Sequence, residues 1–128
     1  MIMNTRIPSK IKNICPQFLV ADITLSMEFY TKNLGFETSF MYEDFYCGIT
    51  KDGCSIHLKS AEPVLEEREN RRNNEHADII LSVEKIDDLY DDIKNRSVEI
   101  IQPLRDMPYG REFYICDPDG YVLAFLEQ

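Results

Sequence analysis

The chain has no tryptophan, only 5 glycines among its 128 residues, and no long apolar run. No stretch approaches the roughly 18 apolar residues of a membrane-spanning helix, so no span is predicted. The N-terminal residues also lack the apolar segment of a secretory signal, and no such leader is predicted. Hydrophobic residues make up 44% and charged residues 29%, which is typical of a globular domain rather than a disordered chain.

Basic residues are in short supply. Lys and Arg number 14 against 23 Asp and Glu, which gives a formal net charge of -9. Proteins that bind nucleic acid or a membrane surface normally present a basic patch, and the only paired basic step, Arg71-Arg72, lies among glutamates. We therefore expect neither nucleic acid nor a membrane as partner. The acidity indicates solubility or, alternatively, a cavity suited to a cationic ligand.

Several catalytic and metal-binding motifs are missing as well. The 4 cysteines form no C-x-x-C pair, which argues against a zinc knuckle or a thioredoxin-like motif. There is no G-x-S-x-G, no phosphate-binding loop and no G-x-G-x-x-G. Free thiols in a reducing compartment are the default for such a chain, so a cytoplasmic location is expected.

The elements that are present follow apolar periodicity. Ile23, Met27, Tyr30 and Leu34 form a helical stripe, and Asp52-Gly53 is a strong hairpin signal. Residues 61–75 read as a charged linker with a short helix after Pro63. Strands are expected at 14–20, 36–42, 45–50, 54–59, 78–83, 98–102 (ended by Pro103), 111–116 and 121–127, and helices at about 22–33 and 86–93.

The order of these elements repeats. A strand, a helix and three strands occur first in residues 12–60 and again in 76–128, on either side of the linker. Each unit alone would expose one face of its sheet, so pairing the two units buries that face. A single domain over residues 12–128 is therefore predicted.

Three segments carry a resemblance to a known family: Phe18-Leu19-Val20-Ala21-Asp22 with the helix that follows it up to Leu34-Gly35-Phe36, Pro108–Phe113, and Asp117-Pro118-Asp119-Gly120-Tyr121. In these the chain resembles the vicinal oxygen chelate superfamily of glyoxalases, bleomycin-resistance proteins and dioxygenases, and is most similar to the bleomycin-resistance branch. The resemblance implies an α+β fold of two β-α-β-β-β modules that form a curved mixed sheet around a cavity. It also implies a homodimer.

Metal-binding members of the superfamily place ligands on four strands. The matching positions here are Cys15, His57, Asp78 and Ala124. A methyl group cannot bind a cation or move a proton, so we expect no metal and no other cofactor. A remaining three-ligand site of Cys15, His57 and Asp78 is the alternative. Without a metal, Cys15 reads as a small buried hydrophobe, His57 as a hydrogen-bonded strand residue, and Asp78 as a strand cap or the partner of a base.

The function that follows is a metal-free protein that binds a small organic molecule and sequesters a cationic or aromatic compound. Seven Tyr and seven Phe can stack on planar cations, although a chain without Trp lacks the strongest such surface. The alternatives are a metal-dependent lyase, isomerase or dioxygenase with an altered ligand set, and a domain that only dimerises. Strand alternation places the predicted ligand-binding residues on the side of the sheets away from the helices. They are Cys15, Gln17, His57, Asp78, Glu112, Tyr114 and Ala124.

Overall fold

The computed structural model describes residues 6–128, and within them the predicted α+β fold of two modules is confirmed. Two four-stranded sheets have equivalent strand orders, β1-β4-β3-β2 and β5-β8-β7-β6. The first module contains β1 (Gln17–Val20), α1 (Ile23–Glu28), the π-helical turn η1 (Phe29–Asn33), β2 (Glu37–Tyr42), β3 (Tyr46–Lys51) and β4 (Cys54–Ser60). The second contains β5 (Ile79–Ser82), α3 (Ile86–Lys94), β6 (Glu99–Met107), β7 (Gly110–Cys116) and β8 (Val122–Glu127).

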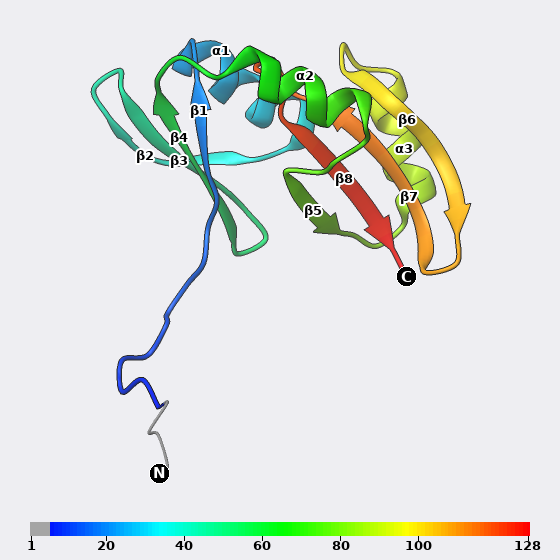
Figure 1. Ribbon diagram of the computed structural model, residues 1–128, viewed down its shortest axis with the longest axis horizontal. Helices are drawn as coiled ribbons and strands as arrows, with labels where there is room; N and C mark the ends of the chain where they lie inside the picture. The colour runs from blue at the N-terminus through cyan, green and yellow to red at the C-terminus, as the bar shows by residue number, and fades with distance from the viewer. Residues whose placement is uncertain (1–5) are drawn as a thin grey trace.

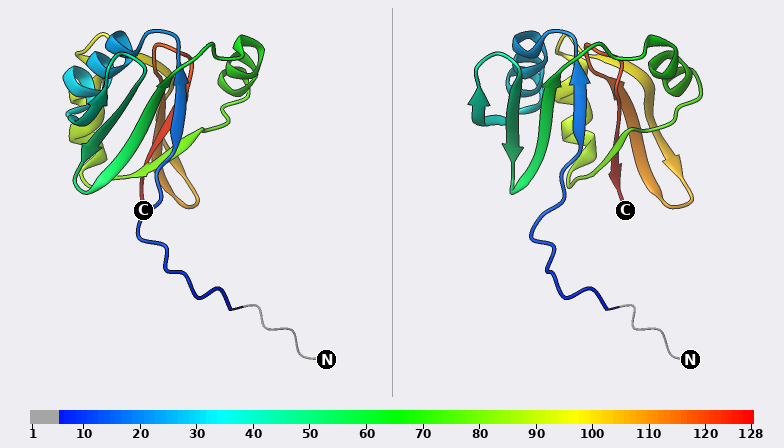
Figure 2. Two further views of the ribbon diagram at one scale, coloured as in Figure 1. Left: turned by 90° about the vertical axis from the view of Figure 1, so that its left-hand side faces the viewer. Right: turned by 60° about the vertical axis from the view of Figure 1, so that its left-hand side comes forward.

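Each sheet is mixed. β1 pairs in parallel with β4, and β5 pairs in parallel with β8, whereas the other strand pairs are antiparallel. The helices α1 and α3 stand between the two sheets (Figures 1 and 2). The charged linker contains α2 (Leu65–Asn73), the helix expected after Pro63. None of the helices in the described part of the chain is long and apolar enough to cross a membrane.

Local sequence accounts for the ends of these elements. The Asp22 carboxylate accepts a hydrogen bond from the Leu25 amide at 3.0 Å and caps α1. Asp52 and Gly53 both have positive φ, 51° and 80°, as the tight turn between β3 and β4 requires.

One strand is longer than its sequence predicts. Pro103 was expected to end the strand at 98–102, but β6 continues to Met107. Proline has no amide proton to give to a neighbouring strand. The pairing with β7 is irregular on both sides of Gln102, and β6 has a neighbour on one side only, so an edge position and a bulged register accommodate it. This extension brings Arg105 into the sheet.

The modules share one hydrophobic core. Phe18 and Val20 of β1 and Ile115 and Leu123 of the second module all belong to it. The ring of Tyr121 stacks on Phe18 at 4.2 Å between centroids. Its hydroxyl also donates to the Leu19 carbonyl at 3.0 Å and accepts from the Leu19 amide at 2.8 Å, which ties the last turn of the second module to the first strand.

The Asp117-Pro118-Asp119-Gly120 turn reinforces this junction. Asp119 accepts hydrogen bonds from the Ala21 amide at 2.9 Å and the Ser26 hydroxyl at 3.0 Å. Asp117 is 5% exposed and accepts from the Tyr30 hydroxyl at 2.6 Å. Burial raises the pKa of Asp117 to about 6 despite this bond. The turn is therefore a connection between the modules as well as a hairpin.

Candidate functional site

The sides of the two sheets that face away from the helices carry the residues singled out from sequence. Phe18 and Val20 lie in the core, so Gln17 and Leu19 face the other way, as predicted. On β7, Phe113 and Ile115 lie in the core, and Glu112 and Tyr114 face outward. Cys15 is half-buried and lies just before β1 begins.

One row of residues crosses all four strands of the first sheet. Gln17 of β1 pairs with His57 of β4, His57 pairs with Gly48 of β3, and Gly48 pairs with Phe40 of β2. A Cβ added to Gly48 would lie 2.2 Å from the Phe40 ring. Glycine is therefore required at residue 48 so that the Phe40 ring can lie flat across the sheet.

Tyr46 is two residues before Gly48 on β3 and lies on the same face beside this row; we call Gln17, Phe40, Tyr46 and His57 the aromatic site. The Phe40 ring lies parallel to Tyr46 within 14°, at 6.1 Å, and perpendicular to His57 at 5.2 Å. Phe40, Tyr46 and His57 are all partly exposed, so the rings form a surface that a flat molecule can reach.

Hydrogen bonds order the polar groups of the aromatic site. The Gln17 amide nitrogen donates to the Tyr46 oxygen at 3.0 Å, and that hydroxyl lies 2.9 Å from His57 Nδ1. The tautomer of His57 sets whether the Tyr46 hydroxyl donates to Nδ1 or accepts from it.

The outer face of the second sheet carries a different cluster. Glu112 is 3% exposed and accepts from Arg105 Nε and Nη2 at 2.9 and 2.6 Å and from the Tyr109 hydroxyl at 2.6 Å. Arg105 also lies 3.1 Å from Glu75 and 5.7 Å from the centre of the Tyr114 ring. The Glu112 hydrogen bond is the largest cause that raises the pKa of Tyr109 to about 12. The Glu112 charge is thus already balanced within the protein.

Tyr114 and Ala124 lie opposite each other on β7 and β8. Ala124 is 4% exposed, whereas Tyr114 is half-buried. Desolvation is the main reason that the pKa of Tyr114 is raised, so its hydroxyl remains protonated at neutral pH. Tyr114 therefore offers a ring and a neutral hydroxyl on this face.

Asp78 is part of an ion cluster that anchors α2. Its carboxylate lies 2.8 Å from Arg68 Nη1 and 3.2 Å from Arg71 Nε, and it accepts from the Val122 amide at 2.8 Å. The Arg68 guanidinium in turn lies 4.2 Å above the Tyr121 ring. The structure therefore supplies the basic partner that sequence reasoning left open for Asp78, and both of its oxygens are engaged.

These residues do not fit the metal centre of the metal-binding relatives. Among residues 6–128 there is no group of three His, Cys, Asp or Glu side chains placed to hold an ion. Ala124 has no donor atom, and Asp78 is already bound by two arginines. Cys15, His57 and Asp78 therefore do not assemble a three-ligand site within one chain.

The predicted ligand-binding set is split between the two sheets. Gln17 and His57 lie on the first, and Glu112, Tyr114 and Ala124 on the second. Since both sheets turn their helix-covered faces to the shared core, the two outer faces do not meet in one chain. Sequence reasoning missed Phe40, Tyr46 and Arg105. A glycine opposite an aromatic residue was a signal for the first of these.

Comparisons with known proteins agree with this architecture. A sequence model of the Glyoxalase/Bleomycin resistance protein/Dioxygenase superfamily matches residues 12–125. No curated protein matches the chain in sequence.

Among solved structures, the fold is similar to that of a bleomycin-binding protein from Streptomyces verticillus, solved with copper(II)-bleomycin. The two chains are 21% identical, with a TM-score of 0.72 over 94% of this chain and 98% of that one. TnmS3, an antibiotic-binding protein from Streptomyces sp. CB03234, is 17% identical with a TM-score of 0.71, over 93% and 98% of the chains. UcmS2 is 19% identical with a TM-score of 0.75, over 92% and 98%. At these identities the likeness concerns the fold.

Proposed function

This chain belongs to the Glyoxalase/Bleomycin resistance protein/Dioxygenase superfamily, and from that premise we propose that it is a metal-free binding protein. Its ligand is a planar organic molecule that carries positive charge, and the protein sequesters this molecule without reacting with it. The aromatic site is the observation that supports the proposal most directly. Antibiotic binding by two proteins of the same fold adds weight to it.

The aromatic site suits a flat ligand for physical reasons. Phe40 and Tyr46 present near-parallel rings, and a planar cation over an aromatic face gains about 0.5–2 kcal/mol. Gln17 and His57 add hydrogen-bonding groups at its edge, which fix the orientation of a bound molecule. None of these side chains is an activated nucleophile, which favours binding over chemistry.

The preference for positive charge rests on the whole chain rather than on one carboxylate. Glu112 is neutralised by Arg105 and therefore gives little attraction of its own. The formal net charge of -9 still produces a negative potential that concentrates cations near the surface. This contribution is screened by salt, so we expect affinity for a cationic ligand to fall as ionic strength rises.

We also propose that the protein is a homodimer. Residues 6–16, before β1, extend away from the body (Figure 1). In this segment the side chains of Ile7, Ile11 and Ile14 are 79%, 76% and 82% exposed. Arg6, Lys10 and Lys12 lie in the same segment, whereas the rest of the chain is acidic. A second copy can bury these apolar groups. It can also place the outer face of its second sheet beside the outer face of the first sheet of this chain.

Two further expectations complete the proposal. Residues 12–128 act as a single domain, which the core shared by both modules supports. The cytoplasm is the proposed location, because Cys15, Cys47, Cys54 and Cys116 are all free.

The test uses bleomycin, a cationic compound with planar rings, titrated calorimetrically into the purified protein in the presence of a metal chelator. Replacing Tyr46 or His57 by alanine is expected to weaken binding by about ten-fold, the equivalent of one lost stacking or hydrogen-bonding contact. Phe45→Ala is the matched control, because Phe45 is an exposed aromatic in the neighbouring β2–β3 turn.

Two results would overturn the proposal. Unchanged affinity in both aromatic-site variants would show that the ligand does not bind at the aromatic site. Near-stoichiometric nickel, zinc, iron or manganese in protein purified without added metal would instead support a metal-dependent lyase, isomerase or dioxygenase.

A further inference from the structure

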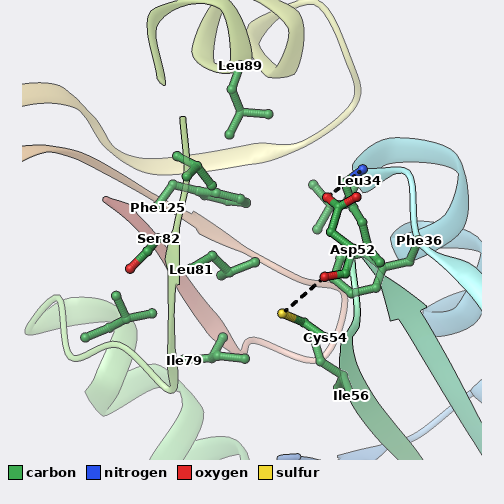
Figure 3. Close-up of a pocket in the computed structure, with 13 residues that line it drawn as sticks. Leu34, Phe36, Asp52, Cys54, Ile56, Ile79, Leu81, Ser82, Leu89 and Phe125 are labelled. Atoms are coloured by element: carbon green, nitrogen blue, oxygen red, sulfur yellow. Dashed lines mark hydrogen bonds and ion pairs between the residues drawn. The ribbon is translucent and has the colours of Figure 1, made fainter. Parts of the chain in front are cut away.

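A separate cavity of about 350 Å³ lies between the two modules, on the helix-covered sides of their sheets (Figure 3). This size is within the range of small-molecule pockets. Its walls are mainly apolar and come from both modules: Leu34, Phe36, Ile56, Ile79, Leu81 and Phe125. Ile56 and His57 are successive residues of β4 and point to opposite faces, so this cavity is distinct from the aromatic site.

A polar cavity of about 330 Å³ adjoins the apolar one, and Lys51 and Asp52 line both. Its other side chains include Glu37 and Thr50. Lys51 Nζ lies 3.6 Å from the Asp52 carboxylate, so these two charges offset each other. One ammonium against the two carboxylates of Glu37 and Asp52 leaves the polar cavity with a formal charge of minus one.

We propose that the paired cavities are a second binding site, for a cationic amphiphile with an apolar body and one ammonium head. The body occupies the apolar cavity, where its removal from water provides most of the affinity. The head lies in the polar cavity, near the Glu37 carboxylate and the Thr50 hydroxyl. An anionic head would meet both the local negative charge and the acidic surface of the chain.

Three compounds with one apolar body test the choice of head group: octylammonium, octan-1-ol and octanoate, titrated into the full chain. Octylammonium is expected to bind about ten-fold more tightly than octanoate, with octan-1-ol between them. Glu37→Gln should reduce the gap between the charged compounds without changing the affinity for octan-1-ol. Equal affinities for octylammonium and octanoate would overturn the proposal.

Two leucines locate the site. Leu81 lines the apolar cavity, whereas Leu65 of α2 is 68% exposed and is not among the residues that line it. Leu81→Gln should weaken octylammonium binding by about ten-fold, and the matched control Leu65→Gln should leave it unchanged. If binding is instead lost in Tyr46→Ala and kept in Leu81→Gln, the amine occupies the aromatic site and the proposal is wrong.

A thiol at the rim of the cavity gives a reading that does not depend on an altered core. Cys54 lines the apolar cavity and is exposed, whereas Cys47 and Cys116 are buried. In a Cys15→Ser protein, saturating octylammonium should slow the reaction of Cys54 with a maleimide by about five-fold or more. An unchanged rate at saturation would show that the amine does not occupy this cavity.

Discussion

The buried carboxylate of Asp117 should give this protein a measurable gain in stability on mild acidification. Its Oδ2 accepts from Tyr30, and its Oδ1 accepts from the amides of Asp119 and Tyr121 at 2.9 and 2.8 Å. Desolvation outweighs these bonds and, with repulsion from Asp119, raises the pKa of the carboxyl from 3.8 to about 6. The folded protein therefore binds this proton more tightly than the unfolded chain does.

The sign of the effect follows from that difference. Between the two pKa values the folded state holds more protons, so the contribution of Asp117 to the free energy of unfolding rises as pH falls from neutrality. With pKa values of 3.8 unfolded and about 6 folded, linkage gives about 1.3 kcal/mol between pH 7 and pH 5. The full contribution, reached near pH 3, is about 3 kcal/mol.

Asp117→Asn isolates this contribution from the other carboxylates. The amide oxygen can still accept from the two backbone amides, but the side chain does not titrate in this range. Urea unfolding of both proteins at pH 7 and pH 5 should show the wild type gaining about 1.3 kcal/mol relative to the variant. If the free energy of unfolding changed by the same amount in both proteins between pH 7 and pH 5, burial would not govern the ionisation of Asp117.

Three other substitutions test contacts described above. Tyr30→Phe should lower the free energy of unfolding by about 2 kcal/mol at pH 7 and by less at pH 5, because it removes a bond to a charged acceptor; equal losses at the two pH values would contradict this. Gly48→Ala should cost about 1–3 kcal/mol in urea unfolding and weaken bleomycin binding, because the Phe40 ring must move. Asp78→Asn should destabilise the protein by about 3 kcal/mol, as two arginines lose their shared partner; a loss below about 0.5 kcal/mol would show that solvent screens the cluster.

The sequence was sufficient for the two modules and for the orientation of their strands. Alternation along a strand has a period of two, so the apolar Phe113 and Ile115 assigned the opposite side to Glu112 and Tyr114 without any knowledge of partners. The capping aspartate and the Asp52-Gly53 turn were likewise readable, since each acts on backbone groups within a few residues.

Local sequence could not show whether an outward side chain is free for a ligand or already bound to another residue of the protein. Glu112 was expected to be available to a ligand, but Arg105 neutralises it, and Arg105 reaches it only because β6 continues past Pro103. A proline in an edge strand and a proline that ends a strand look the same in sequence. The difference depends on whether a neighbouring strand requires an amide proton at that position.

The chain by itself therefore determined the repeated fold and the absence of a carboxylate at residue 124, because both follow from residue type and local periodicity. Only the tertiary structure decided that Phe40 lies flat over Gly48 and that Asp78 is held by Arg68 and Arg71. It also decided that an apolar cavity separates the modules. These features depend on strand register and on contacts between segments distant in sequence, which local periodicity does not encode.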